Sequence, residues 1–186
     1  MLAFDWCHRK DSDREQDSVI RLVQIDVEAR PAEPVEESPI AREVLTANAA
    51  YYSRTGFEPP WVAYLVVDEE GRCVGTCAFK GPPRDGRVEI AYFTFPQFEG
   101  AGFATQVVEA LLKIARTKEP GLTVAAQTLT EDSASTHILE KFGFRCIGTV
   151  DSPEDGPVWE WRLKEVSRPH SGRAAGLLQK KKPSPP

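Results

Sequence analysis

The sequence has 186 residues, of which 41% are hydrophobic and 27% are charged, as expected for one folded domain of ordinary size. This composition excludes an intrinsically disordered chain, and no segment reaches the ~20 consecutive apolar residues of a membrane-spanning helix. The first ten residues include charged side chains and hold no apolar core segment, which argues against a secretory signal. We therefore expect a cytoplasmic protein that has no membrane partner.

The formal net charge of −5 argues against nucleic acid as a partner, because proteins that bind the phosphate backbone normally present a clustered basic face. The charge is unevenly spread: residues 167–186 hold five basic and no acidic residues, so residues 1–166 carry −10. We expect a flexible arm over residues 1–17, one folded domain over residues 18–166 and a disordered basic tail over residues 167–186. The acidic body would attract a cationic substrate at long range, or would serve only solubility.

The four cysteines, Cys7, Cys73, Cys77 and Cys146, show neither a disulfide framework nor the ligand spacing of a zinc site. Cys73 and Cys77 fall within one predicted strand, where four residues span about 13 Å. This separation exceeds the limit of ~7 Å between the Cα atoms of a disulfide, so these two residues cannot pair with each other. We expect reduced, mostly packed thiols and no bound metal.

The first predicted elements are a strand, a loop and a helix. Residues 18–27 are rich in β-branched side chains and predict a strand, and residues 28–37 form a loop that contains two prolines. Ser38 then provides an N-cap, proline takes the first helical position, and Gly56 closes the segment. One helix is therefore expected between Ser38 and Gly56.

Three antiparallel strands are expected next. Residues 61–67 form an almost continuous apolar run, residues 68–71 form a turn, and residues 72–79 return as the second strand of a hairpin. After a loop rich in glycine and proline, residues 88–95 combine aromatic and β-branched side chains and end at Pro96. The chain therefore begins as an antiparallel sheet.

A helical crossover and a terminal hairpin complete the predicted domain. Apolar residues recur at helical spacing over residues 103–115, which predicts an amphipathic helix. This helix is long enough for the strand at residues 122–129 to lie parallel to the preceding strand, as in a β-α-β crossover. A second amphipathic helix over residues 133–142 is followed by strands over residues 144–150 and 158–163.

The segment with the most chemical information joins a strand to the first amphipathic helix through a short loop that contains Gly100 and Gly102. Glycines let the backbone approach a ligand, and the free N–H groups at the start of a helix bind phosphate oxygens. The alternative is that these glycines only shape a tight strand-to-helix turn. A dinucleotide fingerprint fits less well, because Thr105 stands where glycine or alanine is required, and a Walker loop is absent.

Two motifs in this order resemble the signatures of the GNAT superfamily of N-acetyltransferases. Gln97-x-x-Gly100-x-Gly102 after an aromatic strand is similar to its acetyl-CoA pyrophosphate loop. The segment from Glu131 to Phe144 is similar to its Asn-x-x-Ser/Ala helix that ends in Glu-Lys-x-Gly-Phe. The resemblance implies an α+β fold with a mixed, mostly antiparallel sheet of six to seven strands. It also implies helices on both faces and a splayed cofactor gap between the fourth and fifth strands.

The resemblance further implies acetyl-CoA as the cofactor and two sets of backbone contacts to it. In the family, the exposed backbone of the fourth strand pairs with the pantetheine arm, and the matching residues are Phe93, Thr94 and Phe95. Backbone N–H groups of the glycine loop and of the helix start hold the pyrophosphate, and the matching residues are Gly100, Gly102, Phe103, Ala104 and Thr105.

The second motif carries further cofactor contacts and departs from the family pattern. Asp132 stands where asparagine is usual, which keeps a cap for the helix but adds a negative charge near an anionic cofactor. Ser135 is expected to bond the cofactor arm or its sulfur, or only the backbone of its own helix. Leu139 occupies the place where many members carry a tyrosine general acid, so that role cannot be assigned to it.

Glu89 is the predicted catalytic base. Strand parity places it on the face shared by Phe93 and Phe95, where a carboxylate is costly unless it is paired or useful. Family members often place at this position a base that acts through water. The alternative is that Glu89 lies at the exposed start of the strand or pairs with Arg87 or Arg72.

The acceptor site is predicted less directly. The first helices cap the acceptor pocket in the family, so four aromatic residues are expected to line it, with core packing as the equal alternative: Tyr51, Tyr52, Phe57 and Trp61. Tyr92 lies on the opposite strand face from Glu89 and is expected to be a core anchor. His137 is expected to be an exposed surface residue.

These observations predict an N-acetyltransferase that needs no metal and moves an acetyl group from acetyl-CoA directly to a primary amine. The acceptor is expected to be a small-molecule or peptide amine. The alternative is a non-catalytic acyl-CoA-binding sensor or interaction module of the same fold. Leu139 favours this alternative because it stands in place of the tyrosine general acid. The sequence leaves open whether the protein forms a homodimer.

Overall fold

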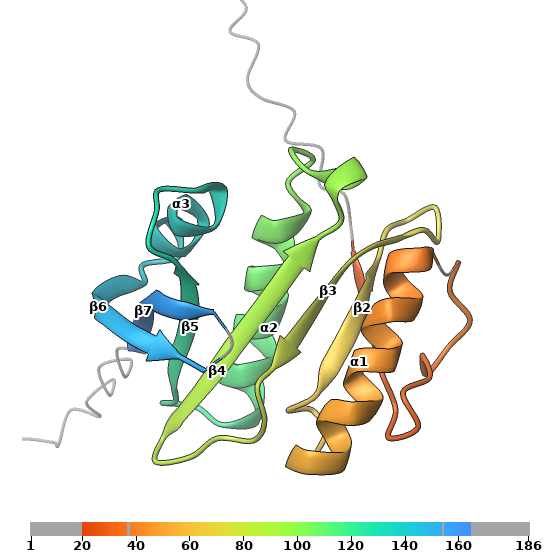
Figure 1. Ribbon diagram of the computed structural model, residues 1–186, viewed down its shortest axis with the longest axis horizontal. Coiled ribbons are helices and arrows are strands. Elements are labelled where there is room, and N and C mark those ends of the chain that lie inside the picture. Colours follow the sequence, from red (N-terminus) through yellow and green to blue (C-terminus); the bar gives the residue numbers. More distant parts are fainter. Residues whose placement is uncertain (1–19, 37, 154, 165–186) are drawn as a thin grey trace, which may run out of the picture.

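A computed structural model describes residues 20–36, 38–153 and 155–164 of the protein (Figure 1). The predicted arm and basic tail lie outside these residues. Within them, the elements follow in this order: β1 (Arg21–Gln24), α1 (Pro39–Thr55), β2 (Ala63–Val67), β3 (Cys73–Phe79), β4 (Arg87–Thr94), the short 3-10 helix η1 (Pro96–Phe98), α2 (Phe103–Lys118), β5 (Thr123–Leu129), α3 (Ala134–Lys141), β6 (Arg145–Ser152) and β7 (Gly156–Lys164).

The seven strands form one sheet in the order β1-β2-β3-β4-β5-β7-β6. Neighbouring strands are antiparallel except β4 and β5, which are parallel. The helix α2 connects these two strands, as the predicted crossover requires. The structure therefore confirms the predicted α+β fold with a mixed, mostly antiparallel sheet.

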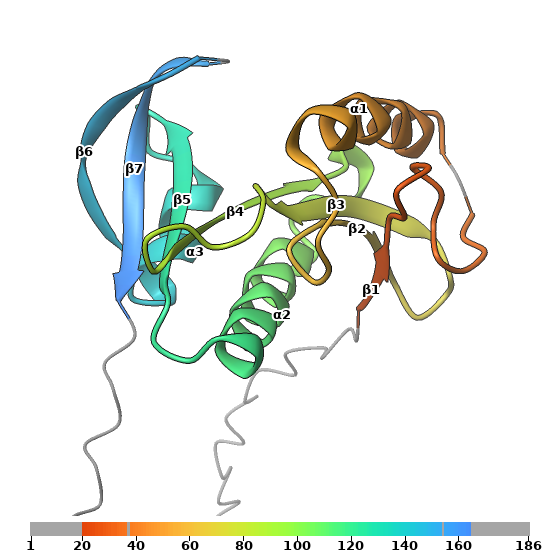
Figure 2. The same ribbon diagram turned by 90° about the horizontal axis from the view of Figure 1, so that it is seen from below.

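Helices cover both faces of the sheet. Figure 2 shows α1 above β2 and β3, with α2 on the opposite side. Six apolar side chains of α2 form its buried stripe: Phe103, Val107, Val108, Leu111, Leu112 and Ala115. Burial of each of the larger side chains contributes about 1.5–3 kcal/mol, so this stripe fixes the helix, and with it the loop before the helix, against the sheet.

The predicted boundaries of α1 and α3 are confirmed by their caps. Ser38 Oγ accepts a hydrogen bond of 3.1 Å from the backbone N–H of Ala41, and Gly56 ends α1 with a positive φ of 83°. At the start of α3, Ser133 Oγ accepts from the N–H of Thr136, whose hydroxyl accepts from the N–H of Ser133. This reciprocal pair fixes the direction in which α3 leaves the sheet.

The first strand is shorter than predicted. Residues 18–27 were expected to be extended, but β1 covers only Arg21–Gln24. The chain then turns at Asp26, whose carbonyl accepts from the N–H of Ala29, a residue with a positive φ of 59°. The main-chain N–H of Arg30 donates to the Asp26 carboxylate and holds its pKa below the usual value. This local turn outweighs the strand preference of the β-branched side chains.

Among the described residues, no two cysteines form a disulfide. Cys73 and Cys77 are buried within β3, and Cys146 is exposed on β6. Burial raises the pKa of the Cys77 thiol, which therefore stays protonated at neutral pH. Cys7 lies outside the described residues.

In the part of the chain that the structure describes, no helix is both long and apolar enough to cross a membrane. The same residues contain no group of three or more His, Cys, Asp and Glu side chains that could hold a metal ion.

The sheet opens between its two parallel strands. The register of β4 and β5 runs from the pair Arg87 and Thr123 to the pair Ile90 and Ala126. Both strands continue beyond that pair, β4 to Thr94 and β5 to Leu129. The strands are therefore splayed, as the family resemblance implies, and the gap is closed at Ile90 and open toward the loop before α2.

Candidate functional site

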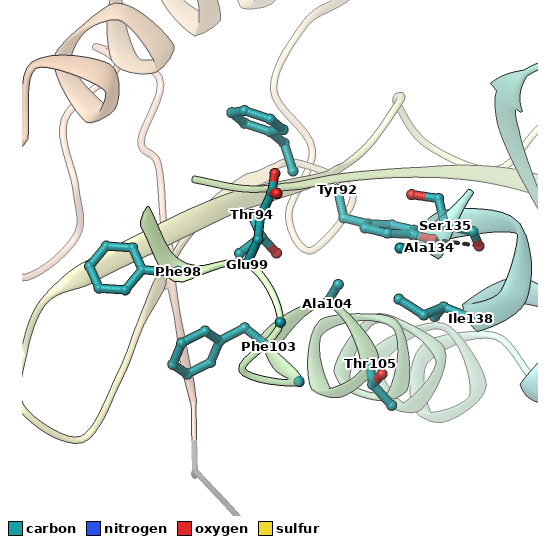
Figure 3. Close-up of a pocket in the computed structure, with 13 residues that line it drawn as sticks. Tyr92, Thr94, Phe98, Glu99, Phe103, Ala104, Thr105, Ala134, Ser135 and Ile138 are labelled. Atoms are coloured by element: carbon teal, nitrogen blue, oxygen red, sulfur yellow. Dashed lines mark hydrogen bonds between the residues drawn. The ribbon is translucent and has the colours of Figure 1, made fainter. Parts of the chain in front are cut away.

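A cavity of about 460 Å³ lies where the open end of the gap meets the start of α2 (Figure 3). It is bounded by the end of β4, the glycine loop, the first turn of α2 and the first turns of α3. Eight of the ten predicted cofactor residues line it: Phe93, Thr94, Gly100, Gly102, Phe103, Ala104, Thr105 and Ser135. We call it the cofactor cavity.

The start of α2 leaves backbone donors facing this cavity. Gly102 occupies the N-cap position with a positive φ of 80°, and no side chain among the described residues caps the helix there. The first helical hydrogen bond is donated by the N–H of Gln106 to the carbonyl of Gly102, so the N–H groups of Phe103, Ala104 and Thr105 precede it. Uncapped N–H groups and the positive end of the helix dipole together suit phosphate oxygens.

The backbone of β4 presents alternate residues to the gap. The carbonyl of Glu89 accepts from Lys80 and the N–H of Phe95 donates to Val74, so odd-numbered residues turn their backbone groups toward β3. Even-numbered residues therefore turn theirs toward β5, and beyond Ile90 these are Tyr92 and Thr94. Of the three residues predicted to contact pantetheine, only Thr94 turns its backbone groups toward the gap, and Tyr92, which was not among the three, does so as well.

Two predicted cofactor residues lie outside the cavity lining. Phe95 is fully buried, and its N–H is already used by the carbonyl of Val74 at 2.9 Å. Asp132 is exposed and lies 3.1 Å from both the hydroxyl of Thr136 and Nε2 of His137, which is itself exposed, as predicted. In this structure Asp132 holds the start of α3 rather than facing the cavity.

Tyr92 links β4 to α3. Its hydroxyl donates to the backbone carbonyl of Ser135 at 3.4 Å, and Figure 3 shows the ring between β4 and α3 beside Ile138. Burial raises the pKa of Tyr92, so the hydroxyl stays protonated well above neutral pH. Leu139 on the same helix is fully buried in the core and does not line the cofactor cavity.

Gly75 is a requirement of the site that the sequence analysis missed. It lies in β3 opposite Thr94, and a Cβ atom built on it would be 2.5 Å from the backbone oxygen of Phe93. No side chain fits at that distance, so only glycine lets β3 approach this part of β4. A glycine inside an otherwise apolar strand was the available signal.

Glu89 is held by ion pairs. Its Oε1 lies 3.1 Å from Nζ of Lys80, and its Oε2 lies 3.3 Å from a guanidinium nitrogen of Arg87. Arg87 also pairs with Glu160 of β7 at 3.2 Å, whereas Arg72 pairs with Asp68 at 2.7 Å. The predicted alternative of a pair with Arg87 is therefore present. Glu89 directly precedes Ile90, so the carboxylate also lies next to the closed end of the gap.

A second cavity, of about 270 Å³, lies on the other side of β4, between α1 and the sheet. Its lining is uncharged and mostly apolar, and it includes Tyr92 and Phe93, which also line the cofactor cavity. We call it the apolar groove. The two cavities therefore meet across one short stretch of β4.

The four predicted acceptor aromatics are placed in or against the core. The Tyr52 hydroxyl is buried and accepts from the N–H of Ala63 at 2.8 Å. Phe57 packs edge-on against Tyr52, and Tyr51 lies beside it on α1. Trp61 is buried against Phe79. None of the four lines a cavity described here, and their contact with an acceptor stays a prediction.

Comparisons with known proteins agree with this geometry. A sequence model of the acetyltransferase (GNAT) domain matches residues 15–145, which is more than half of the chain. A SpeG spermidine N-acetyltransferase chimera with Vibrio cholerae as a source has TM-score 0.58 and 16% identity, over 78% of this chain and 95% of that chain. A GNAT-family acetyltransferase from Bacillus anthracis has TM-score 0.52 and 18% identity, over 67% of this chain and 72% of that chain.

A third structure is RimL, a ribosomal alpha-N-protein acetyltransferase in complex with coenzyme A, with TM-score 0.52 and 15% identity over 69% of this chain and 73% of that chain. At these identities the structural likeness shows the fold alone. The search of curated proteins gave no match. The family match over most of the sequence, joined to a sheet that opens onto an uncapped helix, shows that this chain belongs to the GNAT family of acetyltransferases, whose members use acyl-CoA.

Proposed function

We propose that the protein is an N-acetyltransferase that moves an acetyl group from acetyl-CoA directly to a primary amine. The observation that carries this proposal is the cofactor cavity, where the gap between β4 and β5 leads straight to the uncapped start of α2. The gap suits an extended arm, and the helix start suits a pyrophosphate. Acetyl-CoA joins these two chemical features in one molecule and supplies an acetyl group activated as a thioester.

The backbone of the chain would hold this molecule at two places. The N–H groups of Phe103, Ala104 and Thr105 would bind phosphate oxygens, because they lack partners within the helix. Tyr92 and Thr94 would offer backbone groups to the amides of the arm, in the way that an added strand pairs with a sheet edge. These contacts orient the arm so that its end points toward the closed end of the gap at Ile90.

The acceptor would approach from the α1 side of β4. Glu89 precedes the closed end of the gap by one residue, a rise of about 3.3 Å along the strand, so one water molecule can bridge its carboxylate and an amine placed there. We propose that Glu89 takes the amine proton through such a water. Ion pairs with Lys80 and Arg87 hold the carboxylate in place on the α1 face.

The second candidate is an acyl-CoA sensor without catalysis. The observation that favours it is the buried Leu139, which leaves no hydroxyl at the place of the family's tyrosine acid. The sensor would bind acetyl-CoA in the same cavity and release it unchanged.

One experiment separates the two candidates. Acetyl-CoA should raise the melting temperature in both, since a ligand that binds only the native state stabilises it by about 2.7 kcal/mol at a hundredfold excess over Kd. Only the enzyme should then release free CoA when a panel of primary amines is added, and mass spectrometry should find the acetylated amine. Binding without release over the whole panel would favour the sensor. The cytoplasmic location and a homodimer, both expected from the sequence, stay predictions.

A further inference from the structure

A third cavity, of about 270 Å³, adjoins Glu89 at the start of β4 and carries most of the charge near the site. Its charged lining is formed by Lys80, Arg84, Arg87 and Glu89, and Thr55 at the end of α1 closes one side. We call it the basic cavity. No part of the mechanism above assigns a role to its cations beyond holding Glu89.

The basic cavity continues the apolar groove along the same face of the sheet. Ala78 of β3 is paired with Ala91 of β4, and both line the groove. At the next step along the strands, the N–H of Lys80 donates to the carbonyl of Glu89, and both residues line the basic cavity. The closed end of the gap, at Ile90, therefore lies between an apolar end and a basic end.

The helix α1 runs along both cavities. Asn48 lines the apolar groove and Thr55, two turns later, lines the basic cavity. Both cavities therefore lie along the seam between α1 and the sheet.

The charges of the basic cavity are not balanced. Glu89 and Glu160 form ion pairs with three cations, Lys80, Arg87 and Arg162, and Arg84 in the cavity lining is a fourth cation. These six groups together are net +2, although the protein as a whole is −5. Arg84 makes no ion pair with another described residue, and Nε of Arg87 is buried without a hydrogen-bond partner in the described structure.

The apolar groove excludes a polycation. No carboxylate lines it, and its one side-chain amide, that of Asn48, donates to the carbonyl of Val44 on its own helix. A polyamine would bury charged nitrogens against Val44, Ala47 and Ala63 without a counter-charge, which is strongly unfavourable. An aliphatic or aromatic side chain would be buried there favourably.

We propose that the acceptor is a free apolar α-amino acid. Its side chain would occupy the apolar groove, its carboxylate would bind Arg84 and Lys80 in the basic cavity, and its amine would lie between them at the closed end of the gap, beside Glu89. The side chain, amine and carboxylate are attached to one α-carbon. The apolar groove, the closed end of the gap and the basic cavity follow one another along the sheet face in the same order. This proposal rests on the proposed N-acetyltransferase function and names its substrate.

The chemistry balances with the groups already described. The α-ammonium group loses one proton to solvent and a second through water to Glu89, while a bond forms from nitrogen to the acetyl carbon. The bond from that carbon to sulfur breaks with its electron pair on sulfur, which takes a proton from solvent, and Glu89 returns its proton to solvent. The products are the N-acetyl amino acid and free CoA, with one net proton released.

The test uses full-length protein, acetyl-CoA and matched amines. Leucine and phenylalanine carry all three groups, whereas leucinamide and isoamylamine lack the carboxylate, glycine lacks the side chain and spermidine lacks both. We expect kcat/KM for leucine or phenylalanine to exceed that for each partial match at least about tenfold, because a charged hydrogen bond and a buried side chain each contribute a kcal/mol or more. Isothermal titration with CoA present should show leucine binding and no leucinamide binding.

A variant localises the carboxylate site. Arg84→Gln should raise KM for leucine about fivefold, the usual effect of one exposed ion pair, leave kcat alone and leave leucinamide unaffected. Arg145→Gln, which removes an exposed arginine of β6 outside the three cavities, serves as the matched control.

The outcomes separate this proposal from the proposed function. Efficient acetylation of spermidine, leucinamide or peptides but not of free amino acids would overturn the amino-acid proposal and leave the N-acetyltransferase standing. Leucine binding in calorimetry without CoA release would overturn the enzyme and support the site. An Arg84→Gln variant with an unchanged KM for leucine would overturn the assignment of the basic cavity.

Discussion

The two sides of β4 present different chemical groups to their cavities. The cofactor cavity offers backbone N–H groups and no lysine or arginine in its lining, whereas the α1 side offers charged and apolar side chains around Glu89. Backbone donors at a helix start are kept in every substitution except one to proline. The cofactor side therefore depends on conformation, at glycines above all, and the α1 side depends on the identity of each residue.

The sharpest test of this contrast is Glu89→Gln. If Glu89 takes the amine proton, kcat should fall by about 10²–10⁴-fold at neutral pH, because glutamine keeps the size but cannot accept the proton. Affinity for CoA should barely change, since Glu89 does not line the cofactor cavity. Steady-state kinetics and calorimetry measure the two quantities.

Glu160→Gln is the matched control for that variant. Glu160 is a buried carboxylate that also pairs with Arg87, but it lies on β7 and lines none of the three cavities. The Glu160→Gln variant should have a lower melting temperature than the wild type and a kcat within a few-fold of the wild-type value. If both variants lose stability alike and keep their rate, Glu89 is a structural partner of Arg87 and not the base.

Gly75→Ala should disturb both sides at once, because β3 touches β4 where the cofactor cavity and the apolar groove share it. The added methyl group would meet the backbone oxygen of Phe93 at 2.5 Å, and relief requires β4 to move. We expect the free energy of unfolding to fall by about 1–3 kcal/mol, the range for overpacking, and CoA affinity to fall with it. Chemical denaturation with and without CoA measures both, and an unchanged stability would contradict the close approach.

Gly102→Ala addresses the cofactor side alone. The left-handed φ of 80° costs alanine about 1–2 kcal/mol, and its methyl group would stand where a phosphate must approach. We expect Kd for CoA to rise about tenfold, or 1.4 kcal/mol. The matched control is Gly121→Ala, with a φ of 92° and open space around it after α2. Equal CoA affinity in both variants would place the phosphates elsewhere.

The smallest effect is expected at Glu99, the one carboxylate in the lining of the cofactor cavity. Because it is exposed, solvent screens its repulsion of an anionic ligand. Glu99→Gln should lower Kd for CoA by about two- to threefold at low salt, and the gain should vanish at about 1 M salt. A loss of affinity would mean that the carboxylate takes part in binding.

The difference between the cofactor side and the α1 side of β4 also explains how much of the site could be predicted from the sequence. The glycine loop and the start of α2 are contiguous in sequence, so a local pattern around Gly100 and Gly102 was sufficient to locate the cofactor cavity. The apolar groove joins Asn48, Ala78 and Ala91, which no local pattern connects, because only the packing of α1 on the sheet brings them together.

Two further differences have physical causes. The aromatic residues near the family's acceptor site were expected either to line that site or to pack in the core, and Tyr52 and Trp61 pack in the core, where an aromatic ring is most stabilising. The sequence also shows that β4 is a strand without showing which residues turn their backbone toward the gap. That assignment needs the register with β3, which placed Tyr92 rather than Phe93 or Phe95 at the edge.

The position of β7 has a consequence for synthesis on the ribosome. The strand β5 forms one wall of the gap, and it has four register pairs with β4 but seven with β7, with a further hydrogen bond from Nε1 of Trp161 to Thr128 Oγ1. Since β7 is made after β5, α3 and β6, a nascent chain presents β5 as an open edge for that whole interval. Such an edge pairs readily with other chains, so stalled or shortened products of this protein should aggregate through β5 while finished chains do not.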